Sequence, residues 1–412
     1  MYKNIIIIDN QSYPLGGTSQ VAYKSAIGLH DHGINVTYLC TDNEPNPDLI
    51  KKGIQVVNIY NPGIHRNPNK LQVMINGLWD IHMEKEVRKI LSVFNKDDTL
   101  IHIHGYIHCF SPSIFRACKQ SGIKTVLTLH DYFTLCPCGG LYDFQKNAVC
   151  KLHPMSMQCV LNNCDKRNYL QKIWRVIRQI GITKYAKNNS DLDLIYISDF
   201  SYAKMKDYIG TKHNEYFVRN PYDVGKESKY IAENNHNYVF MGRITKGKGA
   251  DIFCKALSEL ITDKEISGDA VVVGDGDDLK RLQTQFPEIQ FLGWKKHDEM
   301  DEIYATTRSL VFPSRWYEGA PLTPIEFMSR GIPCIIADSN SGKEYIKNNV
   351  DGLLFESENI TDLKKKILYA ENDNNWRTIS EKVRATFNTN CYDNENHIKQ
   401  LISIYQKISE KK

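Results

Sequence analysis

The stretch RWYEGAPLTPIEFMSRG, residues 315–331, holds two carboxylates that could do chemistry. Glu318 and Glu326 stand eight positions apart across a turn with two prolines, where carboxylates could bind hydroxyl groups or transfer protons. A structural explanation competes with this one. Thr323 as N-cap, Pro324 in the first helical position and Glu326 three residues after the cap would form a capping box. Glu326 would then only satisfy backbone N–H groups, and Glu318 would be a solvated loop acid.

Two glycine-containing turns precede helices in the same half of the chain. In FMGRITKGKGADIF, Arg243 and Lys248 flank a turn that opens a helix. Two cations and the N–H groups of a helix start suit a pyrophosphate, and solvated loop charges are the structural alternative. In VVVGDGDDLKRL, Gly274 and Gly276 precede a helix for which Asp277 would be the N-cap.

The first half of the chain offers a glycine pair and a strand-end histidine. Gly16 and Gly17 in PLGGTSQVAYKS could take positive φ and let an anion approach the helix that follows. The pattern is not G-x-G-x-x-G, so a nicotinamide site is poorly supported, and a tight turn without ligand is the alternative. His130 and Asp131 end a strand in LTLHDYF, where side chains emerge into a cleft. A structural hydrogen-bonding role competes for His130.

His102 and His104 alternate on one face of the strand in IHIHGYIHCF. A metal-binding pair is one interpretation. Polar contacts at a wet strand end are the favoured one.

Short β-branched runs alternate with helical stretches throughout the chain, which indicates parallel sheets covered by helices on both faces. We therefore expect an α/β protein with two Rossmann-like, doubly wound domains facing a cleft. Asn220-Pro221 favours an extended turn between them. We predict domains at 1–218 and 219–389, with a helix at 390–412 that crosses back to the first. The expected strands are IIIID, NVTYLC, IQVVNI, LIHIHG, KTVLTLH, LDLIYIS, YVFMGRI, AVVVGDG, IQFLGW, SLVFPS and PCIIAD.

Composition and charge restrict the class of protein. The chain has 412 residues, 42% hydrophobic and 24% charged, and its first apolar run ends at Asp9, too early for a signal peptide or membrane span. Residues 1–190 hold 22 Lys/Arg against 13 Asp/Glu, so this half should face an anionic partner. No zinc-finger, helix-turn-helix or ribonucleoprotein motif supports nucleic acid as that partner. A cytoplasmic protein is expected.

Four segments of the chain together resemble a known family. They are GRITKGKG, VGDGDDLKRL, FLGWKKHDEMDEIYATTRSLVFPS and EGAPLTPIEFMSRGIPCIIADSNSGKEYIKNNVDGLLF. In this order they resemble the C-terminal domain of the retaining glycosyltransferases of family 4, with the E-x7-E element at Glu318 and Glu326. LGGTSQVA and TLHD extend the resemblance to the first domain, and bacterial surface-polysaccharide transferases are the members that it suggests.

The resemblance implies the GT-B fold and a role for each matching residue. Arg243 and Lys248 would bind the diphosphate of a UDP- or GDP-sugar, and Glu326 the ribose hydroxyls. Glu318 would hold the donor sugar together with backbone N–H groups of GAPL, and His130 would contact the sugar's far side. Gly17, with Gly16, would let the first loop close on the phosphates. The GAPL residues are Gly319, Ala320, Pro321 and Leu322.

The implied reaction is transfer of a sugar with retention and without a catalytic metal or other cofactor. Fixed cations and helix N-termini can stabilise the charge that develops on a departing diphosphate, and the sequence shows no D-x-D-like acid pair in a suitable loop. Front-face attack, with the phosphate taking the acceptor's proton, is favoured over a glycosidase-like pair of Glu318 and Asp131.

The acceptor is expected to be a glycan or a polyprenyl-diphosphate-linked sugar, in the synthesis of O-antigen, capsule or exopolysaccharide. The basic segment 166–187 carries Leu170, Ile173, Trp174, Ile177 and Ile180 at helical spacing. A buried core helix explains this pattern. Peripheral attachment to the inner face of the cell membrane is the functional hypothesis.

Five cysteines crowd into CPCGGLYDFQKNAVCKLHPMSMQCVLNNC. Cys136, Cys150, Cys159 and Cys164 resemble a metal knuckle and could hold a structural zinc, with Cys138 or His153 as a substitute ligand. No C-x2-C pair is present, so free or redox-active cysteines are the alternative.

Three other functions compete with glycosyl transfer. A sugar-binding relative without activity would keep the fold, and an oxidoreductase would use the first glycine loop. A synthase or phosphorylase would act on free sugars instead of lipid-linked ones.

Overall fold

The computed structural model describes residues 2–210, 212–222, 230–296, 299–387 and 391–411. The chain divides into two compact units. The first comprises residues 1–145, 150–221 and 391–412, and the second comprises 146–149 and 222–390. The sequence placed the junction after residue 218, whereas the contacts divide the chain after Pro221, and they group 146–149 with the second unit.

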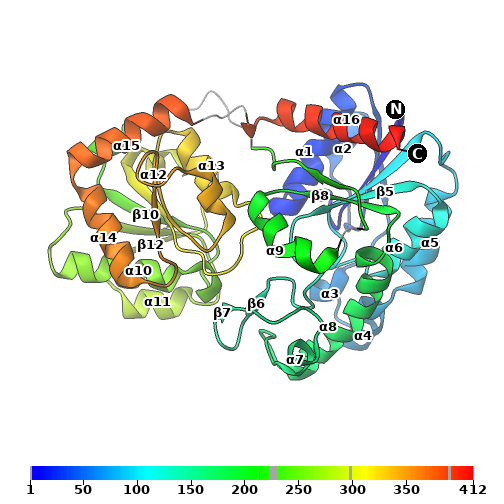
Figure 1. Ribbon diagram of the computed structural model, residues 1–412, viewed down its shortest axis with the longest axis horizontal. Coiled ribbons are helices and arrows are strands. Elements are labelled where there is room, and N and C mark those ends of the chain that lie inside the picture. Colours follow the sequence, from blue (N-terminus) through cyan, green and yellow to red (C-terminus); the bar gives the residue numbers. More distant parts are fainter. Residues whose placement is uncertain (1, 211, 223–229, 297–298, 388–390, 412) are drawn as a thin grey trace. The chain divides into compact units, whose positions relative to one another are not determined.

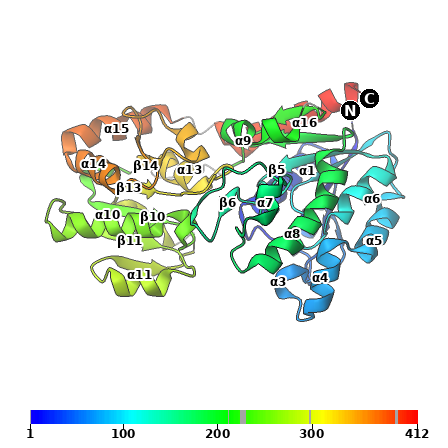
Figure 2. The same cartoon turned by 60° about the horizontal axis from the view of Figure 1, so that its bottom comes forward.

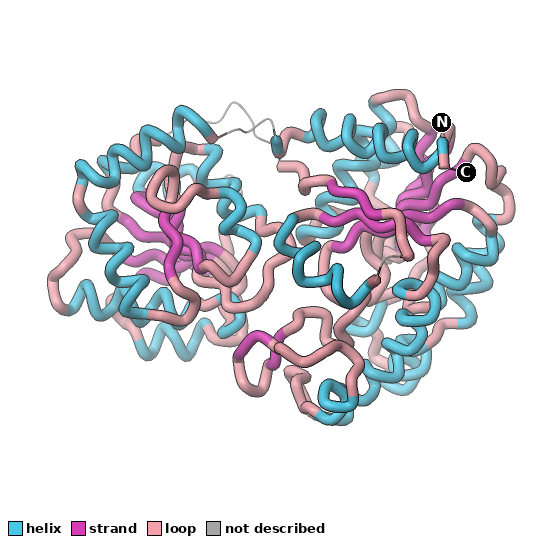
Figure 3. The backbone as a smooth tube through the Cα atoms, in the orientation of Figure 1, coloured by secondary structure: helices cyan, strands magenta, loops and turns pink. Residues whose placement is uncertain are grey.

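The first unit is built on a seven-stranded parallel sheet of order β3-β2-β1-β4-β5-β8-β9 (Figures 1 and 3). Four residues of β1 and all five of β4 are buried, because helices cover both faces and leave no side for polar side chains. The strands are β1 Asn4–Ile8, β2 Asn35–Cys40, β3 Gln55–Asn58, β4 Thr99–Ile103, β5 Lys124–Leu129, β8 Leu192–Tyr196 and β9 Glu215–Phe217.

The helices of the first unit begin at polar caps where the sequence supplies them. Asp80, Asn168 and Ser198 each accept a hydrogen bond from the backbone N–H three residues on. The helices are α1 Gly17–Asp31, α2 Pro47–Lys51, α3 Gly63–Arg66, α4 Lys70–Leu78, α5 Ile81–Leu91, α6 Ser113–Ser121, α7 Met157–Leu161, α8 Tyr169–Ile182, α9 Asp199–Ile209 and α16 Asn394–Glu410. The strands β6 Tyr142–Asp143 and β7 Ala148–Val149 form a separate two-stranded sheet.

The last helix, α16, packs against α1 in the first unit (Figure 1). Gly28 of α1 lies so close to Ile398 that a Cβ atom there would collide with the isoleucine side chain. Nε2 of His397 lies 2.9 Å from Oγ of Ser25. The chain therefore returns to the first unit after it has built the second.

The second unit contains a six-stranded parallel sheet of order β12-β11-β10-β13-β14-β15. Its strands are β10 Asn237–Met241, β11 Ala270–Val273, β12 Gln290–Gly293, β13 Thr307–Phe312, β14 Cys334–Ala337 and β15 Leu353–Phe355. The helices are α10 Ala250–Thr262, α11 Leu279–Gln285, α12 Asp301–Thr306, α13 Leu322–Ser329, α14 Ile360–Glu371 and α15 Asp373–Thr386.

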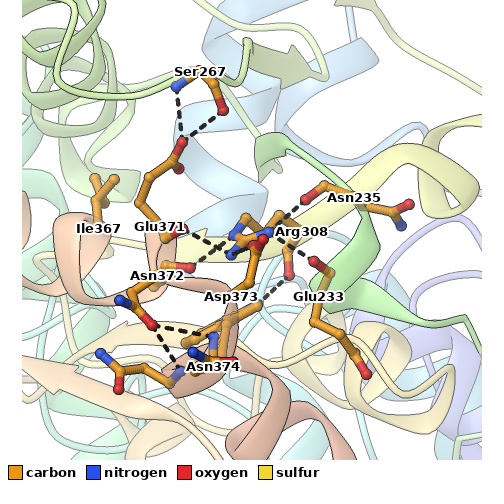
Figure 4. A network of polar contacts seen from close by, with 12 residues as sticks. Glu233, Asn235, Ser267, Arg308, Ile367, Glu371, Asn372, Asp373 and Asn374 are labelled. Atoms are coloured by element: carbon orange, nitrogen blue, oxygen red, sulfur yellow. Dashed lines mark hydrogen bonds and ion pairs between the residues drawn. The ribbon is translucent and has the colours of Figure 1, made fainter.

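A buried arginine ties α14 and α15 to the start of β13 (Figure 4). Arg308 is 1% exposed, and its guanidinium pairs with the Asp373 carboxylate at 2.7 Å. It also donates to the backbone carbonyls of Glu233, Asn235, Ala370 and Glu371. These bonds offset the cost of burying the charge, and they fix the strand whose other end leads into the candidate site.

The expected fold class is confirmed, since two parallel sheets are each covered by helices. All eleven expected strands are present, with ends that differ by up to three residues. The sequence did not predict β6, β7, β9 or β15, which are only two or three residues long.

Candidate active site

Two loops of the second unit are locked together at the ends of β10 and β13. Gly249 has φ +77°, and a Cβ atom there would collide with the carbonyl oxygen of Pro313. The N–H of Arg315 donates to the carbonyl oxygen of Gly247 at 2.9 Å, and the Trp316 ring covers the same glycine. The glycines of this turn therefore allow a close approach of backbone, which positions Lys248 beside the E-x7-E segment.

Glu318 is the centre of the resulting contacts. Its Oε1 accepts from the Lys248 ammonium at 2.7 Å, from Oγ of Ser314 at 2.6 Å and from Nε1 of Trp316 at 2.8 Å. The carboxylate and the ammonium remain 12% and 24% exposed. Lys248 also lies 5.3 Å from the centre of the Trp316 ring. The structure thus brings together two residues that the sequence analysis assigned to sugar and diphosphate.

Each of the two loops carries an arginine, and the surroundings of the two differ. Arg315 binds both oxygens of Asp251, at 2.6 and 3.0 Å, and so fixes the loop to α10. Arg243 is exposed, and its guanidinium has no partner among the described residues. A cation held next to a helix start without a counter-charge can accept an anion.

The capping box that competed as the explanation of Glu326 is absent. Helix α13 begins at Leu322, with Pro321 as its N-cap and no side-chain cap, so Thr323 is already helical. The Glu326 carboxylate instead accepts a short hydrogen bond from the Tyr304 hydroxyl of α12. Arg330 stacks over the Tyr304 ring at 4.1 Å. Glu326 is therefore held by a side chain 22 positions away, which no local pattern in the sequence could have indicated.

The glycines after β11 also have a packing role. A Cβ atom at Gly274 would collide with the carbonyl oxygen of Gly242, and one at Gly276 with that of Ile244. The helix α11 has Asp278, not Asp277, at its N-cap position. This turn therefore packs against the backbone on both sides of Arg243.

In the first unit, Gly16 and Gly17 do not take the positive φ that the sequence analysis expected. Gly16 is extended, with φ −161°, and serves as the N-cap of α1. A Cβ atom at either position would meet no other atom within 4 Å. Among the described residues, neither packing nor backbone strain explains the glycines, which leaves the close approach of a ligand as their proposed purpose.

His130 follows β5 and belongs to a set of packed imidazoles. Its Nε2 lies 3.0 Å from Nδ1 of His104, whose ring packs against that of His102 at a tilt of 36°, with centroids 4.1 Å apart. His102 bonds Tyr405 at 2.6 Å and Thr128 at 2.7 Å. Burial lowers the pKa of His130 and of His102 to about 3, so both rings are neutral at pH 7. The expectation of a wet strand end at His102 and His104 is wrong, because both are buried.

The cysteine cluster does not fit the predicted structural zinc. Among the described residues, no group of three or more His, Cys, Asp or Glu side chains could hold a metal ion, and this covers Cys136, Cys150, Cys159 and Cys164. The Lys172 ammonium lies between thiols, 3.1 Å from Sγ of Cys164 and 3.7 Å from Sγ of Cys159. The Lys172 ammonium has no lone pair and cannot be a zinc ligand, and its positive charge beside the thiols disfavours a second cation there.

The helix α8 is not the buried core helix that its apolar spacing suggested. Leu170, Ile177 and Ile180 are 79%, 49% and 60% exposed, while Lys172 and Gln179 are fully buried. Within the described parts of the chain, no helix is long and apolar enough to cross a membrane.

Comparison with known proteins identifies the domain that carries the site. Residues 225–390 match the family model described as Glycosyl transferases group 1. The matched residues include Arg243, Lys248, Glu318 and Glu326.

Two curated relatives act on lipid-linked sugars by name. One is the UDP-Gal:alpha-D-GlcNAc-diphosphoundecaprenol alpha-1,3-galactosyltransferase of Escherichia coli, 27% identical over 39% of this chain and 41% of the relative. The other is an alpha-1,4-N-acetyl-D-galactosaminyltransferase of Campylobacter jejuni, named for an undecaprenol-linked acceptor. It is 24% identical over 58% of this chain and 66% of the relative. The chain thus matches between two fifths and two thirds of their lengths.

The fold matches a solved structure over both units. Anabaena HepE, solved with UDP and glucose, superposes with a TM-score of 0.67 over 98% of this chain and 100% of its own, at 15% identity. Identity at this level shows the fold alone, which is the GT-B arrangement of two parallel-sheet domains.

Proposed function

We propose that this protein is a retaining glycosyltransferase that uses a nucleotide-diphosphate-sugar. The observation that carries the proposal is the convergence of Lys248 and Glu318 in a Glycosyl transferases group 1 domain, beside the unpaired Arg243. Cations bind the diphosphate, and the carboxylates Glu318 and Glu326 bind sugar and ribose hydroxyls.

The reaction breaks the bond between the anomeric carbon and the diphosphate oxygen. Negative charge develops on that oxygen, and Lys248, Arg243 and the start of α13 stabilise it without a metal ion. The acceptor hydroxyl attacks from the same face, and the departing phosphate takes its proton, which retains the anomeric configuration. His130 contacts the sugar as a neutral hydrogen-bonding group.

The proposed acceptor is a lipid-linked glycan at the inner face of the cell membrane. Two neighbouring helices, α4 and α8, expose apolar side chains and contain no acidic residue. The two helices lie side by side (Figure 2). Nε1 of Trp174 on α8 donates to the carbonyl of Met74 on α4 at 2.8 Å. We call the exposed set the α4–α8 apolar face: Leu71, Met74, Ile75, Leu170, Ile177 and Ile180.

Charge and a polar pocket accompany this face. Lys70, Arg167 and Lys184 are exposed at the ends of the two helices, which suits an anionic membrane surface. Gln72 and Asn76 of α4 line a pocket with other amide and imidazole side chains, a lining that suits sugar hydroxyls. One helix thus offers an apolar side to lipid and a polar side to a glycan.

A panel of nucleotide-sugars tests the activity. We expect one UDP- or GDP-sugar to raise the melting temperature and to be transferred or slowly hydrolysed. Stabilisation by a donor without any turnover, with a lipid-linked acceptor supplied, would instead favour the sugar-binding relative. Transfer to free sugars alone would favour a synthase.

Flotation with vesicles tests the membrane contact. We expect recovery with phosphatidylglycerol vesicles at low salt, and its loss in Leu170→Glu and Ile177→Glu. Val93→Glu is the matched control, since Val93 is 80% exposed elsewhere on the first unit. Equal recovery with neutral and anionic vesicles would refute the electrostatic part.

A further inference from the structure

Three cysteines surround one fully buried ammonium in the first unit. Sγ of Cys164 lies 3.1 Å from Nζ of Lys172 and 3.7 Å from Sγ of Cys138. Sγ of Cys159 also lies 3.7 Å from Nζ of Lys172. Lys172 and the three thiols are each at most 8% exposed.

The ammonium has no carboxylate partner among the described residues. Asp165, the nearest acid in sequence, pairs with Arg175 at 2.6 Å. A buried charge requires a counter-charge, and a thiolate is the one that the contacts of Lys172 offer. The thiol of Cys138 has a different neighbour, since its Sγ lies 3.9 Å from Oδ2 of Asp165.

The two sulfurs therefore differ in the way that a redox pair requires. The ammonium 3.1 Å from Cys164 favours a thiolate there, whereas the carboxylate beside Cys138 favours a protonated thiol, and the two sulfurs lie 3.7 Å apart. Cys164 follows α7, and Cys138 lies in a turn, where Gly139 donates to the carbonyl of Cys136 at 2.9 Å. A disulfide needs sulfurs about 2.05 Å apart, so side-chain rotation and a small loop shift must close the gap.

We propose that Cys138 and Cys164 form a redox-active dithiol that a hydroperoxide converts to a disulfide, with Lys172 holding the reactive thiolate. The Cys164 thiolate attacks one peroxide oxygen, and the O–O bond breaks. This gives a sulfenic acid and a hydroxide, which takes a proton to become water. Sγ of Cys138 then attacks the Cys164 sulfur, its proton joins the departing hydroxide, and a second water leaves. The two sulfurs lose two electrons, and hydrogen peroxide gains them.

One member of the pair, Cys138, lies on the loop that follows the candidate site residue His130. Tyr132 donates its N–H to the carbonyl of Gly139 at 3.2 Å, and Gln179 of α8 donates to the carbonyl of Phe133 at 3.0 Å. A disulfide at Cys138 pulls on this loop. Oxidation is therefore expected to change turnover if the proposed transferase activity holds, but the thiol chemistry can be measured without it.

Peptide mapping tests the pair directly. Protein purified without a His tag is treated with hydrogen peroxide, alkylated and digested. We expect a peptide pair linked through Cys138 and Cys164, lighter by two hydrogens and restored by a thiol reductant. Cys164→Ser should leave Cys138 alkylated. Full alkylation of both residues after peroxide, a disulfide between another pair, or one equivalent of bound zinc would each overturn the proposal.

A second measurement isolates the role of Lys172. Lys172→Met keeps the length of the side chain and removes its charge, and we expect Cys164 to be alkylated at pH 7 at least about tenfold more slowly. Lys172→Arg should restore most of the rate. Cys118, a buried thiol of the same unit on which no cation acts, is the internal reference. Equal rates in the parent and Lys172→Met would show that the ammonium does not activate the thiol.

Discussion

The Lys248 ammonium lies 2.7 Å from Oε1 of Glu318. Both residues are proposed to bind the donor, yet in the structure they bind each other. A diphosphate that attracts Lys248 must weaken this ion pair, and the carboxylate is then available to a sugar hydroxyl. Nucleotide binding and sugar positioning are therefore expected to be coupled through one contact.

The coupling predicts how Glu318→Gln divides binding from turnover. Loss of the carboxylate charge releases Lys248 for the diphosphate, so affinity for the free nucleoside diphosphate should stay the same or rise. The charge-assisted bond to the sugar is lost, at about 1.5–3 kcal/mol, and turnover should fall roughly 10- to 150-fold. Calorimetry with the nucleoside diphosphate and kcat with the cognate donor check the two halves.

The control for this variant is Glu381→Gln, on the exposed side of α15, which removes the same charge far from the loop. It should change neither quantity. Unchanged turnover in Glu318→Gln would contradict the role assigned to this carboxylate.

The contact between Tyr304 and Glu326 predicts a graded pair of effects. Glu326→Gln weakens the bond to the ribose, and we expect donor use to fall by about 1.5–3 kcal/mol in kcat/KM. Tyr304→Phe removes only the hydroxyl that orients the carboxylate, and about 0.5–1.5 kcal/mol is expected. Glu326→Gln cannot act through a lost cap, because α13 begins four residues earlier.

A double-mutant cycle checks the connection between these two residues. If Tyr304 acts through Glu326, the double variant should cost little more than Glu326→Gln alone. Strict additivity would mean that the two side chains act independently. Melting temperatures of all three variants should stay within a few degrees of the parent.

The strands and the loops that follow them could be predicted from the sequence, because a buried strand is marked by a short run of neighbouring residues. Buried parallel strands must be apolar on both faces, so runs such as Ile5–Ile8 stand out, and the turn of Arg243 and Lys248 follows such a run. The short strand β15 has only three residues, too few to show a period.

Contacts between distant residues could not be predicted in the same way. Nothing near Glu326 indicates Tyr304, and the local pattern of Thr323 and Pro324 favoured a capping box instead. The apolar spacing correctly predicts that α8 is a helix, but the apolar side chains that should face the core are exposed to solvent. Burial of the Lys172 ammonium requires a counter-charge, and the sulfur that can supply it belongs to a cysteine that only the fold brings near.

The unpaired guanidinium of Arg243 predicts a specific effect on diphosphate binding. Arg243→Met should weaken binding of the nucleoside diphosphate by about 1.5–3 kcal/mol, since it removes a charged hydrogen-bond donor. Lys246→Met, an exposed residue in the same turn, removes the same charge and should cost no more than about 1 kcal/mol. Equal losses in both variants would indicate only a general electrostatic field, and titration at two salt concentrations would show it.

Buried neutral histidines predict that the protein loses stability in mild acid. Burial lowers the pKa of His102 to about 3 and that of His397 to about 4, and it holds the pKa of His104 well below its usual value. In the unfolded chain these side chains titrate near 6.5. Below that pH the unfolded state binds protons that the folded state refuses, so the free energy of unfolding falls as the pH falls.

Each such histidine lowers the free energy of unfolding by up to about 1.4 kcal/mol for every unit that the pH falls between 6.5 and its pKa in the folded protein. Urea denaturation at pH 7.5, 6.0 and 5.0 should therefore show a steady loss of stability, with little change above pH 7.5. His397→Gln should reduce the slope by about one proton, because the amide can still bond Ser25 and has no charge to acquire. His82→Gln, at an exposed position on α5 in the same unit, should leave the slope unchanged. Burial also raises the pKa of Asp9 to about 7 and that of Asp131 to about 6, and these carboxyl groups oppose the loss of stability as the pH falls. The comparison of variants is therefore decisive: an unchanged slope in His397→Gln would show that this imidazole takes up a proton in the folded protein.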